Sequence, residues 1–315
     1  MLKYIGKRFL LMVPVILGVS FIIFSIMNLT PGDPALLILG EAATPEAVQE
    51  LREEMGLNDN FFVRYGRYVI NAARLDFGQS YRTRLPVIKE IFSRFPNTVT
   101  LAFWGISLAV IIGLPIGIIS AVKQYTLVDG LSLATALLMT SMPAFWLGLI
   151  LMLTFSLRLN LLPATGADTW KNFVLPSVTL AIGTMALLIR MTRSTMLEVI
   201  RQDYIRTAKS KGCSTRRVIF NHALRNAMLP VITVIGINFG FQLGGAMITE
   251  TVFAMPGLGT LMITSVRMKD TPVVMASVLF VAILAGLINL LVDILYVFID
   301  PRIKSQYIKP KKVTA

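Results

Sequence analysis

Six long runs of this chain contain no charged residue, and these runs constrain the fold more than any other feature. An α-helix needs about 20 consecutive, mostly apolar residues to cross a bilayer. Hydrophobic residues make up 55% of the chain and charged residues 15%, whereas a soluble domain carries about 25% charged residues. The sequence therefore predicts an all-α, polytopic membrane protein with six transmembrane helices. The runs are residues 9–32, 95–122, 130–157, 172–189, 226–249 and 271–292.

Two of these runs allow more specific predictions. Run 9–32 follows basic residues, as a signal peptide would, but it is too long for one and no A-x-A cleavage site follows it. We therefore expect a retained transmembrane anchor. Run 172–189 is the weakest candidate for a span, because Pro176 and Gly183 interrupt it and Arg190 follows it.

Small residues and prolines recur inside the runs. Glycines repeat every four residues at positions 113 and 117 and again at 236, 240 and 244, and this spacing lets two helix backbones approach closely. The favoured interpretation is packing within one bundle, and a subunit interface or a substrate pathway is the alternative. Prolines 115, 143, 176 and 230 are expected to loosen the helices in which they lie.

The basic residues predict the orientation of the chain in the membrane. Lys and Arg collect in cytoplasmic loops. With the N-terminus inside, eighteen of the thirty basic residues lie in inside segments and four lie in the two short outside loops. The other eight lie in segment 30–95, where the rule loses force because long loops cross regardless of charge. We therefore predict that both termini lie inside, and we attribute the net charge of +13 to topology rather than to nucleic-acid binding.

The spans divide the chain into four predicted parts. Residues 1–32 form the N-terminus and the first transmembrane helix, and residues 33–94 form an extracytoplasmic helical segment. Residues 95–300 form a core of five further transmembrane helices that includes a basic cytoplasmic loop at 190–227. Residues 301–315 form a cytoplasmic tail.

The extracytoplasmic segment has its own helix signals. Thr44 can cap a helix that Pro45 opens and Gly56 ends. The stretch FFVRYGRYVINAARL repeats aromatic and aliphatic residues at helical spacing, with arginines between them, and LPVIKEIFSRF predicts a third helix at the membrane surface. A small helical cap over the bundle and a docking surface for an extracytoplasmic partner both remain open.

Several features of known transporters and enzymes are absent from the sequence. No Gly-Lys-Ser/Thr sequence occurs, so we expect no phosphate-binding loop and no ATP hydrolysis by this chain. The six runs hold no ionisable residue of the kind that couples ion flow in secondary transporters, and Asp293, just past the last run, is expected to reach to the interface. The single histidine, His222, and the single cysteine, Cys213, predict no catalytic pair and no zinc or haem site, although carboxylates could still bind a metal. We therefore expect no catalytic, metal or cofactor residues in this chain. If the chain moves a solute against a gradient, the energy must come from a partner.

The sequence of the basic loop predicts two short helices joined at a glycine. Leu197, Ile200, Tyr204, Ile205 and Ala208 recur at steps of three and four, with charged residues between them, which predicts a helix with one apolar stripe. Gly212 is expected to end this helix and Ser214 to cap a second one. Such a unit can rest on anionic lipid, remain a solvated loop or fill a groove in a soluble subunit.

This loop resembles the coupling loop of ABC importer permeases, whose pattern is Glu-Ala-Ala, three residues, Gly, nine residues, Ile, one residue, Leu-Pro. Here the positions read Arg206-Thr207-Ala208, Gly212, His222 and Leu224-Arg225. The Ala, Gly and Leu positions match, whereas the Glu, Ile and Pro positions do not. The chain is identified as a member of the dipeptide/oligopeptide/nickel permease family, as the first of its two permease subunits. It shares with that family the stretches LTPGDPA, LDFGQS, GADTWKNFVLPSVTLA, DYIRTAKSKG, HALRNAMLP and ETVFAMPGLGTL.

The resemblance implies half of a transporter for short peptides in a bacterial or archaeal cytoplasmic membrane. Its expected partners are a homologous second permease, two cytoplasmic ATP-binding subunits, an extracytoplasmic substrate-binding protein and membrane lipid. ATP and Mg²⁺ would be bound by the partner subunits. Nickel-chelate or glutathione import is the alternative within the family, and a membrane scaffold or a passive channel is the alternative outside it. The residues expected to contact the ATP-binding partner are Tyr204, Arg206, Thr207, Ala208, Gly212, Arg216, Arg217, His222 and Leu224.

Overall fold

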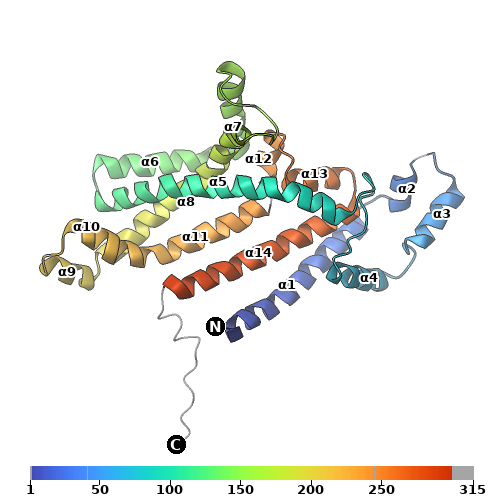
Figure 1. Cartoon of the computed structure of the whole chain (residues 1–315), viewed down its shortest axis with the longest axis horizontal. Coiled ribbons are helices and arrows are strands. Elements are labelled where there is room, and N and C mark those ends of the chain that lie inside the picture. The colour runs from blue at the N-terminus through green and yellow to red at the C-terminus, as the bar shows by residue number, and fades with distance from the viewer. Residues whose placement is uncertain (1, 41, 245, 300–315) are drawn as a thin grey trace, which may run out of the picture. The chain divides into compact units, whose positions relative to one another are not determined.

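The computed structural model describes residues 2–40, 42–244 and 246–299, and within these residues the named secondary-structure elements are all helices (Figure 1). One isolated antiparallel bridge joins Gln79 and Pro86. The chain divides into two compact units. The first consists of residues 1–98 and 256–286, and the second of residues 99–255 and 287–315. The predicted cytoplasmic tail at 301–315 lies outside the described residues.

The first unit contains the N-terminal span and the segment that the sequence predicts to be extracytoplasmic. Its local helix signals are confirmed: the Thr44 hydroxyl accepts a hydrogen bond from the Ala47 amide, Pro45 opens α3, and Gly56 follows α3 with a φ of +62°. The elements of this unit are α1 (Leu2–Leu29), α2 (Pro34–Leu39), α3 (Pro45–Glu54), α4 (Phe61–Ala73), the start of α5 (Val87–Val122), α13 (Leu258–Arg267) and the first part of α14 (Thr271–Ile299).

Aromatic side chains join α4 to α1. Phe24 of α1 is buried and lies 5.2 Å from Phe61 and 5.4 Å from Tyr65, measured between ring centroids. The Tyr65 hydroxyl also donates to the Leu17 carbonyl at 3.1 Å. Edge-to-face rings at these distances stabilise packing beyond the area that they bury. This cluster fixes the position of α4 on the first span.

The third helix predicted at residues 85–95 is confirmed from Val87 onward, but it is not a separate surface helix. It is the first part of α5, which runs unbroken from Val87 to Val122. Val87 and Ile91 are fully buried within the first unit, so the apolar stripe of this segment faces protein. The second span therefore begins with an extension of about two turns that packs inside the first unit.

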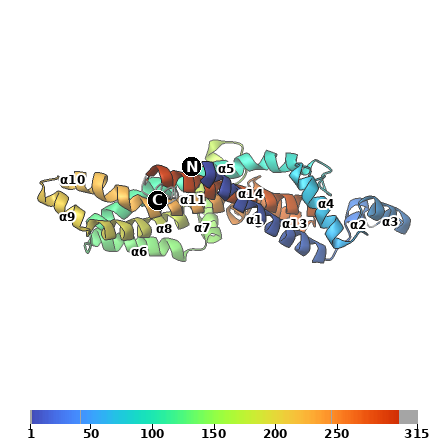
Figure 2. The same cartoon turned by 90° about the horizontal axis from the view of Figure 1, so that it is seen from below.

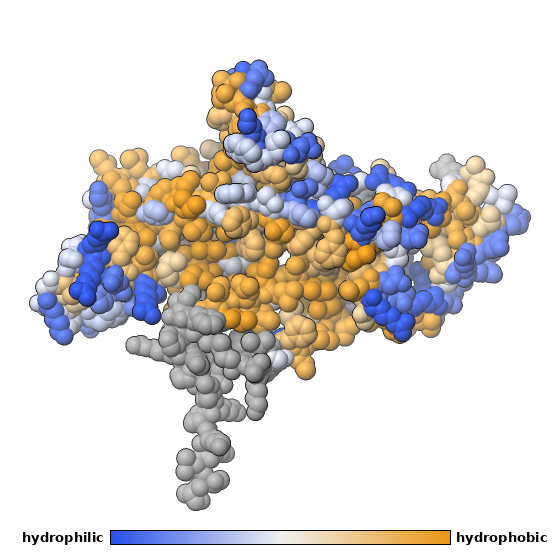
Figure 3. Space-filling model, viewed as in Figure 1, coloured by the Kyte–Doolittle hydropathy of each residue, from blue (hydrophilic) through white to orange (hydrophobic). Residues whose placement is uncertain are grey.

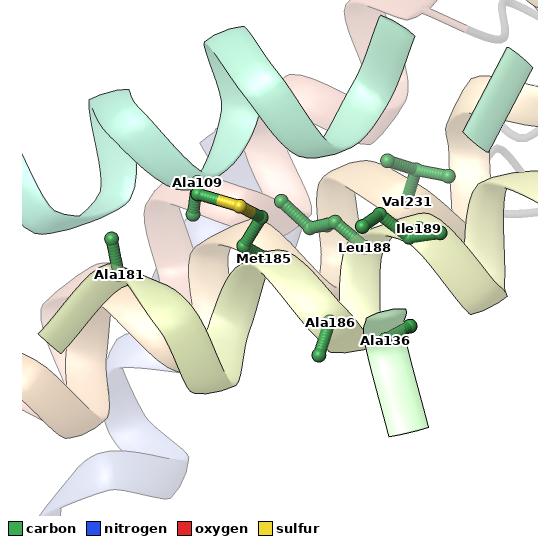
Figure 4. Close-up of a cluster of buried hydrophobic side chains, with 8 residues drawn as sticks. All are labelled: Ala109, Ala136, Ala181, Met185, Ala186, Leu188, Ile189 and Val231. Atoms are coloured by element: carbon green, nitrogen blue, oxygen red, sulfur yellow. The ribbon is translucent and has the colours of Figure 1, made fainter. Parts of the chain in front are cut away.

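The second unit is built around α8 (Figure 4). Buried side chains of α8 meet Ala109 of α5, Ala136 of α6 and Val231 of α11, and small residues dominate this cluster. The remaining elements of the unit are α6 (Leu127–Ser141), α7 (Ala144–Leu151), η1 (Met152–Arg158), η2 (Trp170–Phe173), α8 (Val174–Ile200), α9 (Asp203–Ser210), α10 (Thr215–Arg217), η3 (Val218–Leu224), α11 (Arg225–Leu243) and α12 (Met247–Val252).

The third predicted span is not one straight helix. It consists of α6 and the helix from Ala144 to Arg158, which meet at a bend of 96° (Figure 2). Met142 and Pro143 are both extended at the bend, as expected where a proline disfavours helical geometry in the residue before it. Within the described residues, five helices are long and apolar enough to cross a membrane, or six when this bent pair counts as one span.

The fourth span is longer than its sequence suggested. Helix α8 passes through Pro176 and Gly183 and continues beyond Arg190 to Ile200. Pro176 is the third residue of the helix, in the first turn, where a missing amide proton breaks no helical hydrogen bond. The expectation of an interrupted span that ends at Arg190 is therefore wrong. The fifth span ends at Leu243, and the last part of run 226–249 forms the separate α12.

Large apolar side chains are exposed along the span helices. Leu10 of α1 is 72% exposed, Ile111 of α5 is 66% exposed and Leu131 of α6 is 67% exposed. Figure 3 shows hydrophobic side chains along these helices and hydrophilic side chains at α9 and α10. Exposed apolar residues in such number suit helices that are surrounded by lipid.

The repeated glycines pack within the chain, as favoured from the sequence. A methyl group added at Gly117 would lie 2.7 Å from Thr192 Cβ and 2.9 Å from the Ile189 carbonyl oxygen of α8. A methyl group at Gly236 would lie 2.1 Å from a methyl carbon of Val292. These glycines let α5 and α8, and α11 and α14, approach closely.

We predict that Gly117→Ala destabilises the chain by about 1–3 kcal/mol, because the added methyl overpacks the contact with the α8 backbone. Gly183→Ala is the matched control, since no atom lies within 4 Å of its added methyl and alanine favours a helix by about 0.5–1 kcal/mol over glycine. Thermal unfolding in detergent should show a lower midpoint for the first variant and an unchanged or higher one for the second. Equal midpoints would contradict the close approach of α5 and α8.

Candidate functional site

The first helix of the basic loop is shorter than its apolar pattern predicts. Leu197 and Ile200 lie in the last turns of α8, and the chain then turns at Arg201 and Gln202. Gln202 is extended, with φ −70° and ψ 149°, and α9 begins at Asp203. The stripe predicted as one helix is therefore divided between two. Periodicity continues across the break because both helices face the same apolar cluster.

Gly212 ends α9 as predicted. Its φ is +80°, a left-handed conformation that costs other residues roughly 1–2 kcal/mol. The Gly212 amide donates to the Lys209 carbonyl at 2.9 Å, and the Cys213 amide donates to the Ala208 carbonyl at 3.2 Å. Together these two bonds form a Schellman motif, in which a left-handed residue satisfies the last carbonyls of a helix. The turn reverses the chain within two residues.

The second helix of the loop is continuous with the fifth span. Ser214 takes the extended N-cap position, although its side chain makes no capping hydrogen bond. From Thr215 the chain passes through α10 and the π-helical η3 directly into α11, and the span candidate runs from Thr215 to Leu243. A displacement at α10 is therefore applied directly to a span helix.

The apolar sides of α9 and η3 are buried against the second unit. Ile205 of α9 and Val218 of η3 are almost fully buried, and they pack with Ile118 of α5 and Met196 of α8 in one cluster. The Tyr204 hydroxyl accepts a hydrogen bond from Asn226 at 2.8 Å, which joins α9 to the start of α11. The apolar stripe thus faces protein, and not lipid.

All nine predicted coupling residues lie on α9, the turn that follows it, α10 and η3. Ala208 and Leu224 are partly buried against the cluster around Ile205, and His222 is also partly buried. The other six are exposed and form the outer surface of α9, the turn and α10. They are Tyr204, Arg206, Thr207, Gly212, Arg216 and Arg217.

A buried ion pair, which the sequence reading missed, lies near this cluster. Arg193 of α8 donates from Nε to Asp129 Oδ1 at 2.6 Å and from Nη2 to Oδ2 at 2.8 Å. The side chain of Asp129 is 5% exposed and that of Arg193 is 19% exposed. Asp129 also accepts from the Ser120 hydroxyl at 2.6 Å and from the Tyr125 amide at 3.0 Å. Four hydrogen bonds therefore saturate the carboxylate, as a buried charge requires.

Position in the sequence offers one signal that could have identified buried charged residues of this kind. Asp129, Glu250 and Asp270 each stand directly beside a charge-free run, and each is at most 3% exposed. An acidic residue at the edge of a run is therefore a candidate for burial at a helix end, whereas the basic residues at the run edges are exposed or only partly buried. Within the described ranges, no group of three or more His, Cys, Asp or Glu side chains is placed to hold a metal ion.

We predict that Asp129→Asn destabilises the chain by about 3–5 kcal/mol, because it leaves the Arg193 charge buried without its partner. The double variant Asp129→Asn with Arg193→Met should be less destabilised than the single variant, since it removes both charges. Thermal unfolding of the wild type, both single variants and the double variant forms a complete cycle. If the stability lost by the double variant equals the sum of the losses of the two single variants, the two side chains have no coupling energy.

Comparisons with known proteins identify the family. Residues 113–305 match the family described as "Binding-protein-dependent transport system inner membrane component", and residues 1–102 match the N-terminal model of the same kind of protein. The dipeptide transport system permease protein DppB of Alkalihalophilus pseudofirmus is 43% identical, over 96% of this chain and 100% of its own length. The glutathione transport system permease protein GsiC of Escherichia coli is also 43% identical, over 96% of this chain and 99% of its own length.

Solved structures show the same fold at lower identity. An inward-facing structure of the MetNI methionine ABC transporter covers 67% of this chain and 96% of its own, with a TM-score of 0.57 and 19% identity. An amino acid ABC transporter covers 66% of this chain and 94% of its own, with a TM-score of 0.53 and 14% identity. With its several membrane-spanning helices, this chain belongs to the family of membrane-embedded permease subunits of binding-protein-dependent ABC importers.

Proposed function

We propose that this chain is one of two permease halves of an ATP-driven importer of short peptides, and that the surface of α9, Gly212 and α10 docks on a cytoplasmic ATP-binding subunit. The observation that carries the docking proposal is the division of this loop into two sides. Its apolar side is buried in the cluster around Ile205 and Val218, while its other side exposes Arg206, Arg216 and Arg217. An ordered, basic surface on a helix pair suits a complementary protein groove.

The proposed coupling runs through contacts within the second unit. Closure of the ATP-binding subunits would displace α9, and Ile205 would pass that displacement to Met196 of α8 through their shared cluster. The continuity of α10, η3 and α11 would pass it to the fifth span. ATP and Mg²⁺ would be bound and ATP hydrolysed by the two ATP-binding subunits. A homologous second permease would complete the pathway, and an extracytoplasmic binding protein would deliver the substrate.

The substrate class rests on the relatives. One protein at 43% identity is named for dipeptide transport and another for glutathione transport. Both cargoes are short peptides with free carboxylates, so import of a short peptide is the function that both relatives support. Glutathione import is the second candidate within this class.

We predict that Gly212→Pro abolishes ATP-driven peptide uptake without preventing assembly. Proline fixes φ near −65° and removes the amide proton, so it can form neither the +80° turn nor the hydrogen bond to Lys209. The measurement is accumulation of a radiolabelled dipeptide in proteoliposomes that contain the whole complex, with ATP hydrolysis recorded in parallel. Hydrolysis should continue without accumulation.

Gly212→Ala and Gly40→Ala form a matched pair for this test. Gly212 has a φ of +80° and Gly40 a φ of +87°, and neither has an atom within 4 Å of an added methyl. The ψ of 165° at Gly40 makes its alanine variant the more strained of the two, so Gly40→Ala is a stringent control for backbone strain. Uptake should fall for Gly212→Ala and not for Gly40→Ala. Normal uptake by an assembled Gly212→Pro complex would overturn the docking proposal. Flux without ATP would instead favour a channel, and absence of any uptake by the wild-type complex would favour a scaffold.

A further inference from the structure

The first unit contains an open cavity of about 510 Å³ that the proposed coupling does not use. Small-molecule sites in proteins have volumes of about 300–1,000 Å³. The wall of this cavity is formed by α3, α4, the segment from Asp76 to Arg84 and the first turns of α14. Apolar side chains such as Phe77 and Met275 make up part of this wall, and charged and hydroxyl groups make up the rest.

One face of α4 supplies the polar side of the cavity. Arg64, Arg67, Tyr68 and Asn71 all line it, and their spacing of three, four and seven residues puts them on one helical face. Arg67 is bound to Asp59 at 2.5 Å. The guanidinium of Arg64, by contrast, makes no hydrogen bond and no ion pair with any residue that the structure describes. A half-buried guanidinium without a partner is a natural site for an anion.

The hydroxyl of Tyr68 is also without a partner. Its oxygen is buried, and it has no hydrogen bond within the described part of the chain. Most buried polar groups in proteins are hydrogen-bonded, so an unbonded one needs an explanation. Burial, and then the neighbouring Tyr65, raise the pKa of Tyr68, which keeps the hydroxyl protonated. Tyr68 stands one helical turn after Arg64, so the two can donate to the same ligand.

The same wall holds a second tyrosine hydroxyl and two carboxylates. Burial and then Asp270 raise the pKa of Tyr81 to about 12, against the opposing effect of Arg64, so Tyr81 is also a donor at neutral pH. Glu54 and Asp76 line the cavity too, and they would repel a ligand that is only negative. The cavity therefore offers donors for one carboxylate and acceptors for one ammonium group.

We propose that this cavity binds a short zwitterionic peptide, with its terminal carboxylate at Arg64 and Tyr68 and its ammonium group toward Glu54 and Asp76. The inference deepens the proposed function and rests on it, because it assigns an extracytoplasmic site for the imported substrate class. The cavity volume admits a peptide of a few residues, whereas a single acidic side chain of a docking protein would leave most of it empty.

The test is calorimetric titration of the assembled complex, without ATP and without its binding protein, using dialanine as the probe. Dialanine amide should bind at least about ten-fold more weakly, because a charge-assisted hydrogen bond is lost. Arg64→Gln and Tyr68→Phe should each weaken the binding of dialanine by about the same factor. Arg82→Gln is the matched control, because Arg82 is exposed in the same segment and does not line the cavity.

Hydrogen exchange provides a second readout that does not depend on the variants. Dialanine should slow amide exchange in α4 of the wild-type complex. Equal affinity of dialanine and its amide, equal affinity of the wild type and Arg64→Gln, or unchanged exchange in α4 would each overturn the proposal. The proposal would also be overturned if dialanine does not bind and the binding protein docks on Arg64. The occupant of the cavity would then be a carboxylate of the binding protein. If ATP-driven uptake stays intact in any of these cases, the proposed function stands and the cavity assignment alone is wrong.

Discussion

The buried bond between Asp129 and Arg193 is the interaction on which the arrangement of the second unit depends. It joins the start of α6 to α8 through two short hydrogen bonds, and Ser120 of α5 donates to the same carboxylate. Three helices are thereby held at one point. Burying two charges is costly, so a pair of this kind contributes less to stability than to fixing one arrangement over others. Here it fixes α8, the helix that leads into the proposed coupling loop.

The second attachment of the loop is apolar and lies close to the first. Met196 stands three residues after Arg193 on α8, and it packs with Ile205 and Val218 in a single cluster. A directional polar bond and a deformable apolar contact thus act on the same helix. In the proposed mechanism, the ion pair keeps α8 rigid while the apolar cluster transmits the displacement of α9. The long α8, which packs on α5, α6 and α11, carries that displacement toward the middle of the unit.

Sequence reasoning succeeded where the cause was local. Thr44 and Gly212 were placed correctly because a cap or a left-handed turn depends on a few neighbouring residues. The prolines show where prediction from the sequence failed. Pro143 lies at a bend of 96°, whereas Pro176 lies in the first turn of α8 and does not disturb the helix. The effects of the two prolines can be told apart only when the first residue of each helix is known. The bond between Asp129 and Arg193 joins residues 64 positions apart, and no pattern along the chain predicts such a pairing.

The single cysteine of the chain allows the central claim to be measured directly. Cys213 follows Gly212 in the turn of the proposed coupling loop and is partly exposed. A short bifunctional maleimide reagent should cross-link Cys213 of the intact complex to an ATP-binding subunit that carries a cysteine at its permease-facing groove. The account predicts cross-linking in membranes, with a yield that changes when ATP is added, and no product after Cys213→Ser. Efficient assembly and transport with no cross-link to any position in that groove would contradict it.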